Sequence, residues 1–362
     1  MKTKNLFMDV NAIQTLPPSN INRDDTGSPK TAQYGGTRRS RVSSQSWKRA
    51  IRSYFLENSE DGNVGVRSYK IPDYIASKIK KIDSSINDEE ALKMADDILK
   101  EAGVKTKNFK TTALFFLGNS QAEKLARAAV DKIKDKNLLK EMLKDDPAVD
   151  IALFGRMVAD DPSLNEDASC QVAHAISTHS VETEFDFFTA VDDLQEETNA
   201  GAGMLGTIEY NSSTLYRYAN VAVHEFVRQL SDKEETINAL KLFVEAFAKS
   251  LPTGKVNTFA NTTIPSFIIV TLREDRPVNL VSAFENPVKA YKNKGFVEES
   301  VEKLLKEYKK SEKFVEEPLA TFCLSLNEFN SIDGIKVEDN FKALLKDLEE
   351  KLGEIIPDEL GE

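Results

Sequence analysis

The chain has 362 residues, of which 40% are hydrophobic and 30% are charged, proportions typical of a folded globular protein with a substantial core. Its net charge of −11 excludes nucleic-acid binding by bulk positive charge, so such binding must be local. The only two cysteines, Cys170 and Cys323, support neither a disulfide framework nor a cysteine metal site. Neither a signal peptide nor a membrane-spanning apolar run is apparent. We expect a cytoplasmic protein without a cofactor or a membrane contact.

The N-terminal residues 6–13 alternate between apolar and polar side chains, which predicts a strand that ends at Leu16-Pro17-Pro18. Residues 20–46 follow as a long polar segment that contains glycine. A loop of this length inside a compact domain is usually functional or disordered.

A basic segment spans residues 23–52 within this otherwise acidic chain. Its two acids, Asp24 and Asp25, leave it at net +6, so the rest of the chain carries −17. Such a local excess of cations favours a polyanionic partner. The cations are Arg23, Lys30, Arg38, Arg39, Arg41, Lys48, Arg49 and Arg52.

A helix is predicted to begin at the two serines Ser43 and Ser44, which are good N-cap residues. Its apolar face would carry Trp47, Ala50, Ile51, Tyr54 and Phe55, and a second face would carry Gln45, Lys48, Arg49 and Arg52. A helix start also offers unpaired N–H groups to a phosphate. We therefore predict that this face binds a phosphate backbone; the alternative is an ordinary solvated helix face.

Residues 58–147 are expected to be helical. A capping box at residues 87–90 and Gly103 bound one helix, and a second capping box at residues 120–123 opens another that ends before residue 145. The second helix carries a row of lysines with interleaved acids, for which a solvated face is the favoured interpretation. These are Lys132, Lys134, Lys136, Lys140 and Lys144.

Residues 181–211 alternate, turn at glycines and resume as a strand, which predicts a projecting β-hairpin arm. The arm holds eight acids and no base, so the arm of one copy could meet the basic segment of the next in a head-to-tail assembly. Phe187 and Phe188 could stack on bases. The acids are Glu182, Glu184, Asp186, Asp192, Asp193, Glu196, Glu197 and Glu209.

Catalytic and metal sites find little support. The arm's acids lack an accompanying histidine or a ligand spacing, and His174 and His179 are five residues apart, unlike a zinc-binding pair. Gly254-Lys255 lacks the other residues of a P-loop. We expect both histidines to be structural or surface residues.

The remaining elements are a helix capped at residues 231–234, a buried strand at 264–272 and amphipathic helices at 296–308 and 340–352. Their order fits an α+β fold with a split βαβ sheet and large insertions.

Several runs of this sequence resemble CasC, the crRNA-binding backbone subunit of the type I-E CRISPR Cascade complex. The likeness covers most of residues 5–290. It rests on Asn22-Arg23-Asp24-Asp25, Tyr34-Gly35-Gly36, Arg38-Arg39-x-Arg41-Val42-Ser43-Ser44-Gln45-Ser46-x-Lys48-Arg49-Ala50-x-Arg52, Val149-Asp150-Ile151-Ala152-Leu153-x-Gly155-Arg156-Met157, Phe188-Thr189-Ala190-Val191-Asp192-Asp193-Leu194-Gln195-Glu196 and Tyr216-Arg217-Tyr218-Ala219-Asn220.

The resemblance implies a hand-shaped fold. An RRM-like (ferredoxin-like) palm would comprise residues 1–57 and 212–362, helical fingers residues 58–172, and a β-hairpin thumb residues 181–211. Copies would line up along the crRNA with other Cascade subunits, and the guide's bases would stay free to pair with target DNA.

The resemblance also implies site residues. Met157 would wedge against a base and Phe188 would lie by a flipped nucleotide, while Lys136, Lys140 and Lys144 could touch duplex DNA. The full predicted RNA-binding set is Arg23, Arg38, Arg39, Arg41, Ser43, Ser44, Gln45, Lys48, Arg49, Arg52, Arg156, Met157, Phe187 and Phe188.

Three functions therefore remain in view. The first is a non-catalytic scaffold that binds guide RNA without sequence preference. The second is a guided ribonuclease using Asp24 or Asp25, as related backbone subunits of type III effectors use a loop aspartate. The third is a homopolymeric structural protein without RNA.

Overall fold

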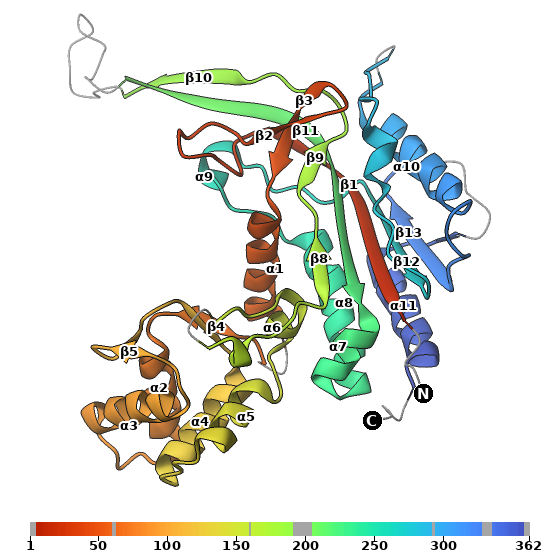
Figure 1. The fold of residues 1–362 in the computed structure, drawn as a ribbon. Coiled ribbons are helices and arrows are strands. Elements are labelled where there is room, and N and C mark those ends of the chain that lie inside the picture. The colour runs from red at the N-terminus through yellow and green to blue at the C-terminus, as the bar shows by residue number, and fades with distance from the viewer. Residues whose placement is uncertain are drawn as a thin grey trace, which may run out of the picture.

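The computed structural model describes residues 5–59, 63–158, 161–190, 205–291, 294–327 and 335–357. Its centre is a large sheet with the strand order β14-β13-β12-β1-β11-β9-β3-β2, to which β8 and β10 add by pairing with β11. Figure 1 shows this sheet beside a helical block, with a hairpin projecting from one end. The expected α+β class is confirmed.

The middle of the sheet is antiparallel. Strand β1 (Phe7–Ser19) pairs with β11 (Leu205–Ala222) on one side and with β12 (Phe267–Arg273) on the other. Beyond β12 lie β13 (Ala320–Ser325) and β14 (Lys336–Val337), two strands that the sequence patterns did not indicate. Strand β1 runs through Pro17 and Pro18, contrary to expectation, because the register shifts between Leu16 and Ser19, where the prolines cannot donate hydrogen bonds.

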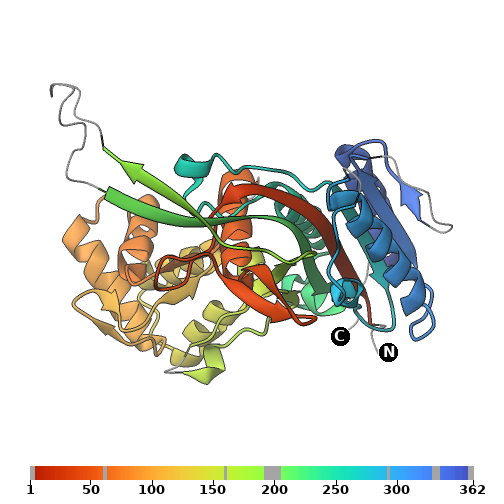
Figure 2. The ribbon, with the colours of Figure 1, turned by 90° about the horizontal axis from the view of Figure 1, so that it is seen from above.

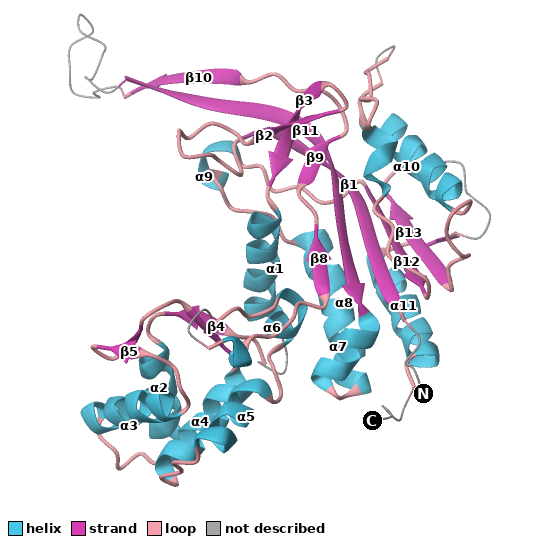
Figure 3. Ribbon diagram, viewed as in Figure 1, coloured by secondary structure: helices cyan, strands magenta, loops and turns pink. Residues whose placement is uncertain are grey.

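Helices cover both faces of the sheet. Met8, Val10 and Ala12 of β1 face a core formed with α1 (Ser44–Asn58), α7 (Val223–Leu230), α8 (Lys233–Lys249) and α11 (Phe341–Ile355). Ile13 faces the opposite core, formed with α10 (Val297–Ser311) and the short helix η3 (Leu280–Phe284). This alternation follows from the two-residue period of a strand. Figures 2 and 3 show the resulting layers.

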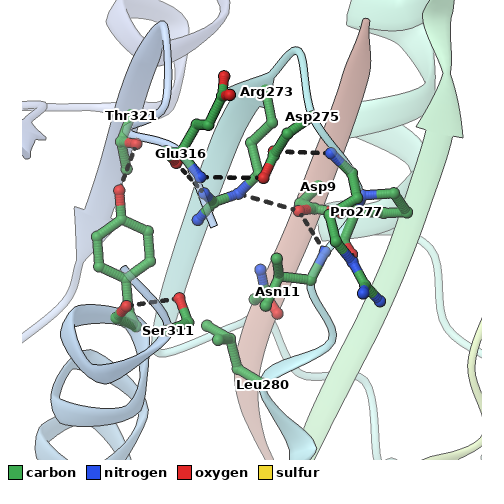
Figure 4. Close-up of polar contacts among 12 residues, drawn as sticks. Asp9, Asn11, Arg273, Asp275, Pro277, Leu280, Ser311, Glu316 and Thr321 are labelled. Carbon is green, nitrogen blue, oxygen red and sulfur yellow. Dashed lines mark hydrogen bonds and ion pairs between the residues drawn. The ribbon is translucent and has the colours of Figure 1, made fainter. Parts of the chain in front are cut away.

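A buried polar cluster ties β1 to β12 on the α10 side (Figure 4). Asp9 accepts hydrogen bonds from the Tyr218 hydroxyl (2.7 Å) and the Val278 N–H (3.0 Å), and its carboxylate lies 3.5 Å from the Arg273 guanidinium. Tyr308 is linked to Thr321 through their hydroxyls at 2.8 Å. These bonds compensate polar groups that the core removes from water.

The segment expected to be a long polar loop contains a hairpin instead. Strands β2 (Thr31–Tyr34) and β3 (Thr37–Val42) are joined at Gly35 and Gly36, whose φ angles are +56° and +73°. Positive φ at both central residues is what a tight hairpin turn requires, and glycine allows it. The hairpin lies at one edge of the sheet and leads directly into α1.

The fingers contain their own hydrophobic core, centred on Ile75, Leu99 and Leu125. Their helices are α2 (Ile71–Ile82), α3 (Asp88–Glu101), α4 (Asn119–Val130) and α5 (Lys136–Lys144), with short strands β4 (Val66–Ser68), β5 (Thr106–Lys107), β6 (Lys110–Thr111) and β7 (Phe115–Leu117). Asn87 caps α3 as predicted, by accepting from the Glu90 N–H.

The single long helix predicted after residue 120 is wrong, because the chain forms two helices here. Lys132 has a φ of +57°, which breaks α4, and Asp135 caps α5 by accepting from the N–H groups of Asn137 and Leu138. The fingers then connect through α6 (Val149–Phe154), η1 (Pro162–Leu164), β8 (Cys170–Val172) and β9 (Ala175–Ser177). Since β8 pairs with β11, we count it with the palm sheet.

The thumb is the hairpin formed by β10 (Glu184–Thr189) and the first part of β11. The same strand β11 then continues into the centre of the sheet, so the arm is a direct extension of the palm (Figure 1). In the part of the chain that the structure describes, no helix is long and apolar enough to cross a membrane.

Candidate nucleic-acid interface

A groove of about 1120 Å³ lies where α1 meets the base of the fingers. It brings together two predicted segments that are more than 100 residues apart, the polar face of α1 and the Gly155-Arg156-Met157 turn. Its lining contains cationic and apolar side chains as well as the two acids Glu166 and Asp167. The lining residues are Gln45, Lys48, Arg49, Arg52, Arg67, Leu114, Phe116, Phe154, Gly155, Arg156, Met157, Asn165, Glu166, Asp167 and Ala168.

Helix α1 places its side chains as its periodicity predicts. Trp47, Ile51 and Phe55 are buried against the palm, which turns Gln45 and Arg49 outward into the groove. The helix is anchored by Arg217, a buried cation whose guanidinium lies 3.7 Å from the centre of the Trp47 ring. Burial lowers the pKa of Arg217 to about 9. The palm therefore fixes which face of α1 is offered to a ligand.

The groove is lined by three cations of α1, which differ in their exposure and in their partners. They are Lys48, Arg49 and Arg52. Arg49 is exposed, whereas Lys48 is half-buried with its ammonium 5.5 Å from the centre of the Phe154 ring. Arg52 is half-buried and forms an ion pair with the buried Asp150 at 2.8 Å. Arg49 and Lys48 are thus the cations of α1 best placed to meet an anion.

The turn after α6 separates two neighbours that were predicted to act together. Gly155 has a φ of +78°, and Met157 projects into solvent with 82% of its surface exposed. Arg156 instead points inward, where it donates to the carbonyl oxygens of Leu164 (2.9 Å) and Leu143 (2.7 Å) and to Gln121 Oε1 (3.2 Å). Burial lowers the pKa of Arg156 to about 10. Its guanidinium is therefore engaged in hydrogen bonds within the fingers.

The three arginines of the β2–β3 hairpin also differ in their exposure. Arg39 is fully buried and donates to the carbonyl oxygens of Ser177 (2.9 Å) and Phe284 (2.8 Å), so its predicted contact with RNA is replaced by a structural role. Its neighbour Arg38 is exposed. Arg41 lies between these extremes, since it donates to the carbonyl oxygen of Thr31 and meets His174 Nδ1 at 3.0 Å.

Arg23 is exposed in a loop at the start of the basic segment. Asp24 stabilises the conformation of the same loop. Its carboxylate accepts hydrogen bonds from the N–H groups of Thr26 and Ser28, both at 3.0 Å, and from the Thr26 hydroxyl. These bonds, of which that from the Thr26 hydroxyl is the strongest, lower the pKa of Asp24. Among the described residues, no group of three or more histidine, cysteine and acidic side chains is placed to hold a metal ion.

Ser43 is the N-cap residue of α1, but its side chain forms no capping hydrogen bond, and Ser43 and Ser44 are both half-buried.

His179 is buried, as expected of a structural histidine. Its Nδ1 meets the Ser180 carbonyl oxygen at 2.9 Å, and its Nε2 accepts from the Thr214 N–H at 3.0 Å. Burial lowers the pKa of this imidazole.

The thumb exposes aromatic side chains on both of its faces. Phe187 is opposite Thr207 and has 66% of its surface exposed, whereas Phe188 is opposite Gly206 and has 38% exposed. Gly206 must lack a side chain, because a Cβ there would lie 2.3 Å from the Phe188 ring. Of the eight predicted thumb acids, Asp192, Asp193, Glu196 and Glu197 lie outside the described residues.

The three predicted finger lysines lie on α5, and none of them lines the groove. Lys136 and Lys144 are exposed, but Lys140 pairs with Asp161 at 2.5 Å and donates to Ser163. That bond from Lys140 is the main reason why the pKa of Asp161 falls to about 2. Two of the three lysines therefore present free charge at this surface.

Eight lining residues of the groove were missed from the sequence: Arg67, Leu114, Phe116, Phe154, Asn165, Glu166, Asp167 and Ala168. Arg67 is exposed within β4, Leu114 is exposed just before β7, and Asn165 follows η1. The expectation of helix throughout residues 58–147 concealed Arg67, Leu114 and Phe116, which lie in or next to short strands. The alternation of Val64, Val66 and Ser68 with Gly65 and Arg67 was the signal that could have indicated a strand there.

The chain is similar to known proteins over most of its length. A family model described as "CT1975-like protein" matches residues 8–350. Solved structures match as well, among them two of CRISPR RNA-guided surveillance complexes. One is titled "CRISPR RNA-guided surveillance complex, pre-nicking" and shows 32% identity and a TM-score of 0.83, with 96% of this chain and 100% of that chain covered. The other, "CRISPR RNA-guided surveillance complex", shows 27% identity and a TM-score of 0.73 over 95% of this chain and 99% of that chain. No curated protein matches.

Proposed function

Because this chain belongs to the CT1975-like family and is a CasC-type backbone subunit, we propose that it binds crRNA within an RNA-guided surveillance complex. The observation that carries this proposal is the groove in which Gln45, Lys48 and Arg49 face Met157. Cations suit the phosphates of a single strand, and apolar side chains suit its bases. The predicted type I-E subtype is part of this proposal.

Guide recognition should ignore sequence, since the spacer of each guide differs. The groove offers side-chain cations and apolar surfaces, which contact phosphates and base faces without reading base edges. The bases would remain available to pair with target DNA. The exposed Lys136 and Lys144 are proposed to contact the flanking duplex, where point charges suffice.

The first test measures the affinity of the purified chain for single-stranded RNAs of unrelated sequence over a range of salt concentrations. Lys48→Ala with Arg49→Ala should weaken binding by the same factor for each RNA. The slope of log K against log[salt] should fall by about 0.7 for each phosphate that the variant no longer neutralises.

The matched control for this pair is Lys346→Ala with Lys351→Ala, which removes the same charge from α11, outside the groove. This control should leave the slope within error of wild type. Equal losses of affinity in the two double variants, or a loss confined to one RNA sequence, would contradict the proposal.

Several copies are proposed to line up head to tail along the guide, beside other Cascade subunits in the cytoplasm. The described thumb carries Glu184, Asp186 and Glu209, which favour contact with a basic surface of a neighbouring copy. Charge reversal of Asp192, Asp193, Glu196 and Glu197 should lower the mass of the assembly in ultracentrifugation. A purified assembly without nucleic acid, judged from its 260/280 nm absorbance ratio, would favour the homopolymeric alternative.

We also propose that the chain is a scaffold without catalytic activity. The support is that Asp24, one of the two candidate aspartates for RNA cleavage, uses its carboxylate to close its own loop. The assembled complex, incubated with complementary RNA and Mg²⁺, should leave that RNA intact. Cleavage at regular intervals that is lost in Asp25→Ala would instead establish the ribonuclease.

A further inference from the structure

Asp150 and Arg52 form the centre of a contact between the palm and the fingers. Asp150 is fully buried in α6, and its two carboxylate oxygens accept from different elements. One accepts from Arg52 Nε of α1 at 2.8 Å and the other from the N–H of Gly65 at 2.8 Å. The bond from Gly65 reaches the segment that leads into the fingers, so one carboxylate links α1 to that segment.

Arg52 and Gly65 complete this contact. Arg52 Nη2 donates to the Gly65 carbonyl oxygen at 3.2 Å, and the guanidinium lies 4.3 Å from the centre of the Phe116 ring on β7. A side chain on Gly65 would not fit, because its Cβ would lie 2.4 Å from that ring. Both main-chain polar groups of Gly65 are therefore paired with the Arg52–Asp150 ion pair, and Phe116 closes it on one side.

Asp150, Arg52 and Gly65 are each hydrogen-bonded to another member of this contact. A buried carboxylate facing a guanidinium at 2.8 Å neutralises much of its charge, and removing either partner leaves the other uncompensated. Burial raises the pKa of Asp150 and the charge of Arg52 opposes this rise. Arg52 therefore differs from Arg49, which lies about one turn earlier on α1 and is exposed.

We infer that Asp150 and Arg52 are positioning residues, which hold the fingers against α1 and so set the width of the RNA groove. This inference rests on the proposed function, since the groove is taken to hold RNA. It assigns a role to Asp150 and changes the role of Arg52 from a phosphate ligand to a link between two parts of the fold.

Asp150→Asn separates this inference from simple electrostatics. Removing a negative charge beside a groove for a polyanion should strengthen RNA binding if charge alone matters. If Asp150 positions the fingers, RNA binding should instead weaken, by roughly tenfold. Asp167→Asn is the matched control: Asp167 is an exposed acid that lines the same groove, and its loss should strengthen binding slightly.

Arg52→Lys and Arg52→Gln provide a second comparison. Lysine keeps the positive charge but cannot bond to both Asp150 and Gly65 in the planar geometry of a guanidinium. A positioning role predicts that both variants lose affinity, Arg52→Gln more because it leaves Asp150 without a cation, with little change in the salt slope. Retention of near wild-type affinity in Arg52→Lys, together with weaker binding in Arg52→Gln, would overturn the inference.

A distance measurement distinguishes misplacement of the fingers from general loss of stability. Both native cysteines are buried, so spin labels on Lys93→Cys of α3 and Lys346→Cys of α11 would report the separation of fingers and palm. Asp150→Asn should broaden this distance distribution in protein that remains folded by circular dichroism, and Asp167→Asn should not. An unchanged distribution in Asp150→Asn would count against the inference.

These outcomes can be told apart from a failure of the proposed function. If the wild-type chain binds no RNA, the proposed function fails, while the distance measurement still tests the link between fingers and palm. If the wild type binds RNA and Asp150→Asn binds more tightly, the function stands and the positioning role fails.

Discussion

Gly35 lies so close to Glu285 that a Cβ at this glycine would be 1.7 Å from the Glu285 carbonyl oxygen. This contact seats the turn of the β2–β3 hairpin against the end of η3, where the Tyr34 hydroxyl also donates to the Val281 carbonyl oxygen at 3.2 Å. The hairpin leads into α1, so the packing at Gly35 helps to fix the start of the helix that lines the groove.

Gly35→Ala is expected to destabilise the protein by about 3 kcal/mol or more, because main-chain atoms must move to admit the methyl group. Gly36→Ala is the matched control. Gly36 has a similar positive φ but no atom within 4 Å of its Cβ position, so the cost should be only about 1–2 kcal/mol of backbone strain. Urea unfolding of both variants measures the difference. Equal destabilisation would show that the turn conformation, and not the packing against Glu285, matters.

Met157 and Arg156 are adjacent, yet their substitution should have opposite consequences. Met157→Ala removes an exposed side chain and should change stability by less than about 0.5 kcal/mol, while weakening RNA binding several-fold. Arg156→Gln removes buried hydrogen bonds to Leu143 and Leu164 and should cost about 3 kcal/mol. Thermal unfolding and RNA titration of each variant check this. A destabilised Met157→Ala would show that Met157 supports the fold.

The sequence predicted the exposed face of α1, which forms one side of the groove, because periodicity determines which side of a helix is buried. Trp47, Ile51 and Phe55 lie at helical spacing, and the fold buries that face as expected, which leaves Gln45 and Arg49 outside. This prediction needed no knowledge of distant contacts. The hydrophobic effect acts on the helix as a whole and orients all its side chains together.

Charge counting could not predict which arginines of the basic segment are exposed and which are buried. Arg38 and Arg39 contribute the same charge to the count. Neighbouring residues on a strand point to opposite faces, however, so Arg38 is exposed and Arg39 is buried. Only the register of β3 with β2 settles which, and that register depends on the turn at Gly35 and Gly36. The pairing of Arg52 with Asp150, 98 positions away, is likewise set by tertiary packing.

The thumb face that carries Phe187 and Leu205 should be required for assembly along RNA. Both side chains are largely exposed, and both belong to the same face of the hairpin because Phe187 pairs with Thr207 and Leu205 pairs with Thr189. Phe187→Ser with Leu205→Ser should leave the unfolding free energy nearly unchanged, since little surface becomes newly exposed. The number of copies on a long RNA, measured by mass photometry, should fall.

The matched control for the thumb is Ile264→Ser with Phe314→Ser, which removes two other exposed apolar side chains far from the thumb in sequence. This control should assemble as the wild type does. Unchanged assembly in the thumb variant would mean that neighbouring copies meet through another surface.

Asp9 should make stability depend on pH in a direction unusual for a carboxylate. Burial raises its pKa to about 6 from the ordinary value of 3.8, although hydrogen bonds from Tyr218 and Val278 and the charge of Arg273 oppose this rise. The folded state therefore binds a proton more tightly than the unfolded state between these two values. The stability contributed by this proton is present below the unfolded pKa and is lost as pH rises through the folded pKa.

Comparison with Asp9→Asn isolates this effect, because asparagine does not titrate. The free energy of unfolding of the wild type minus that of Asp9→Asn should decrease by up to about 3 kcal/mol between about pH 4 and pH 7. Asp24→Asn serves as a control of opposite sign: the pKa of Asp24 is lowered, so its contribution is lost as pH falls. Urea unfolding from about pH 2.5 to pH 7 measures both differences, because the contribution of Asp24 changes mainly below its ordinary pKa of 3.8. A wild-type minus Asp9→Asn difference that stays constant or rises with pH would show that the fold favours the ionised carboxylate, held by Arg273.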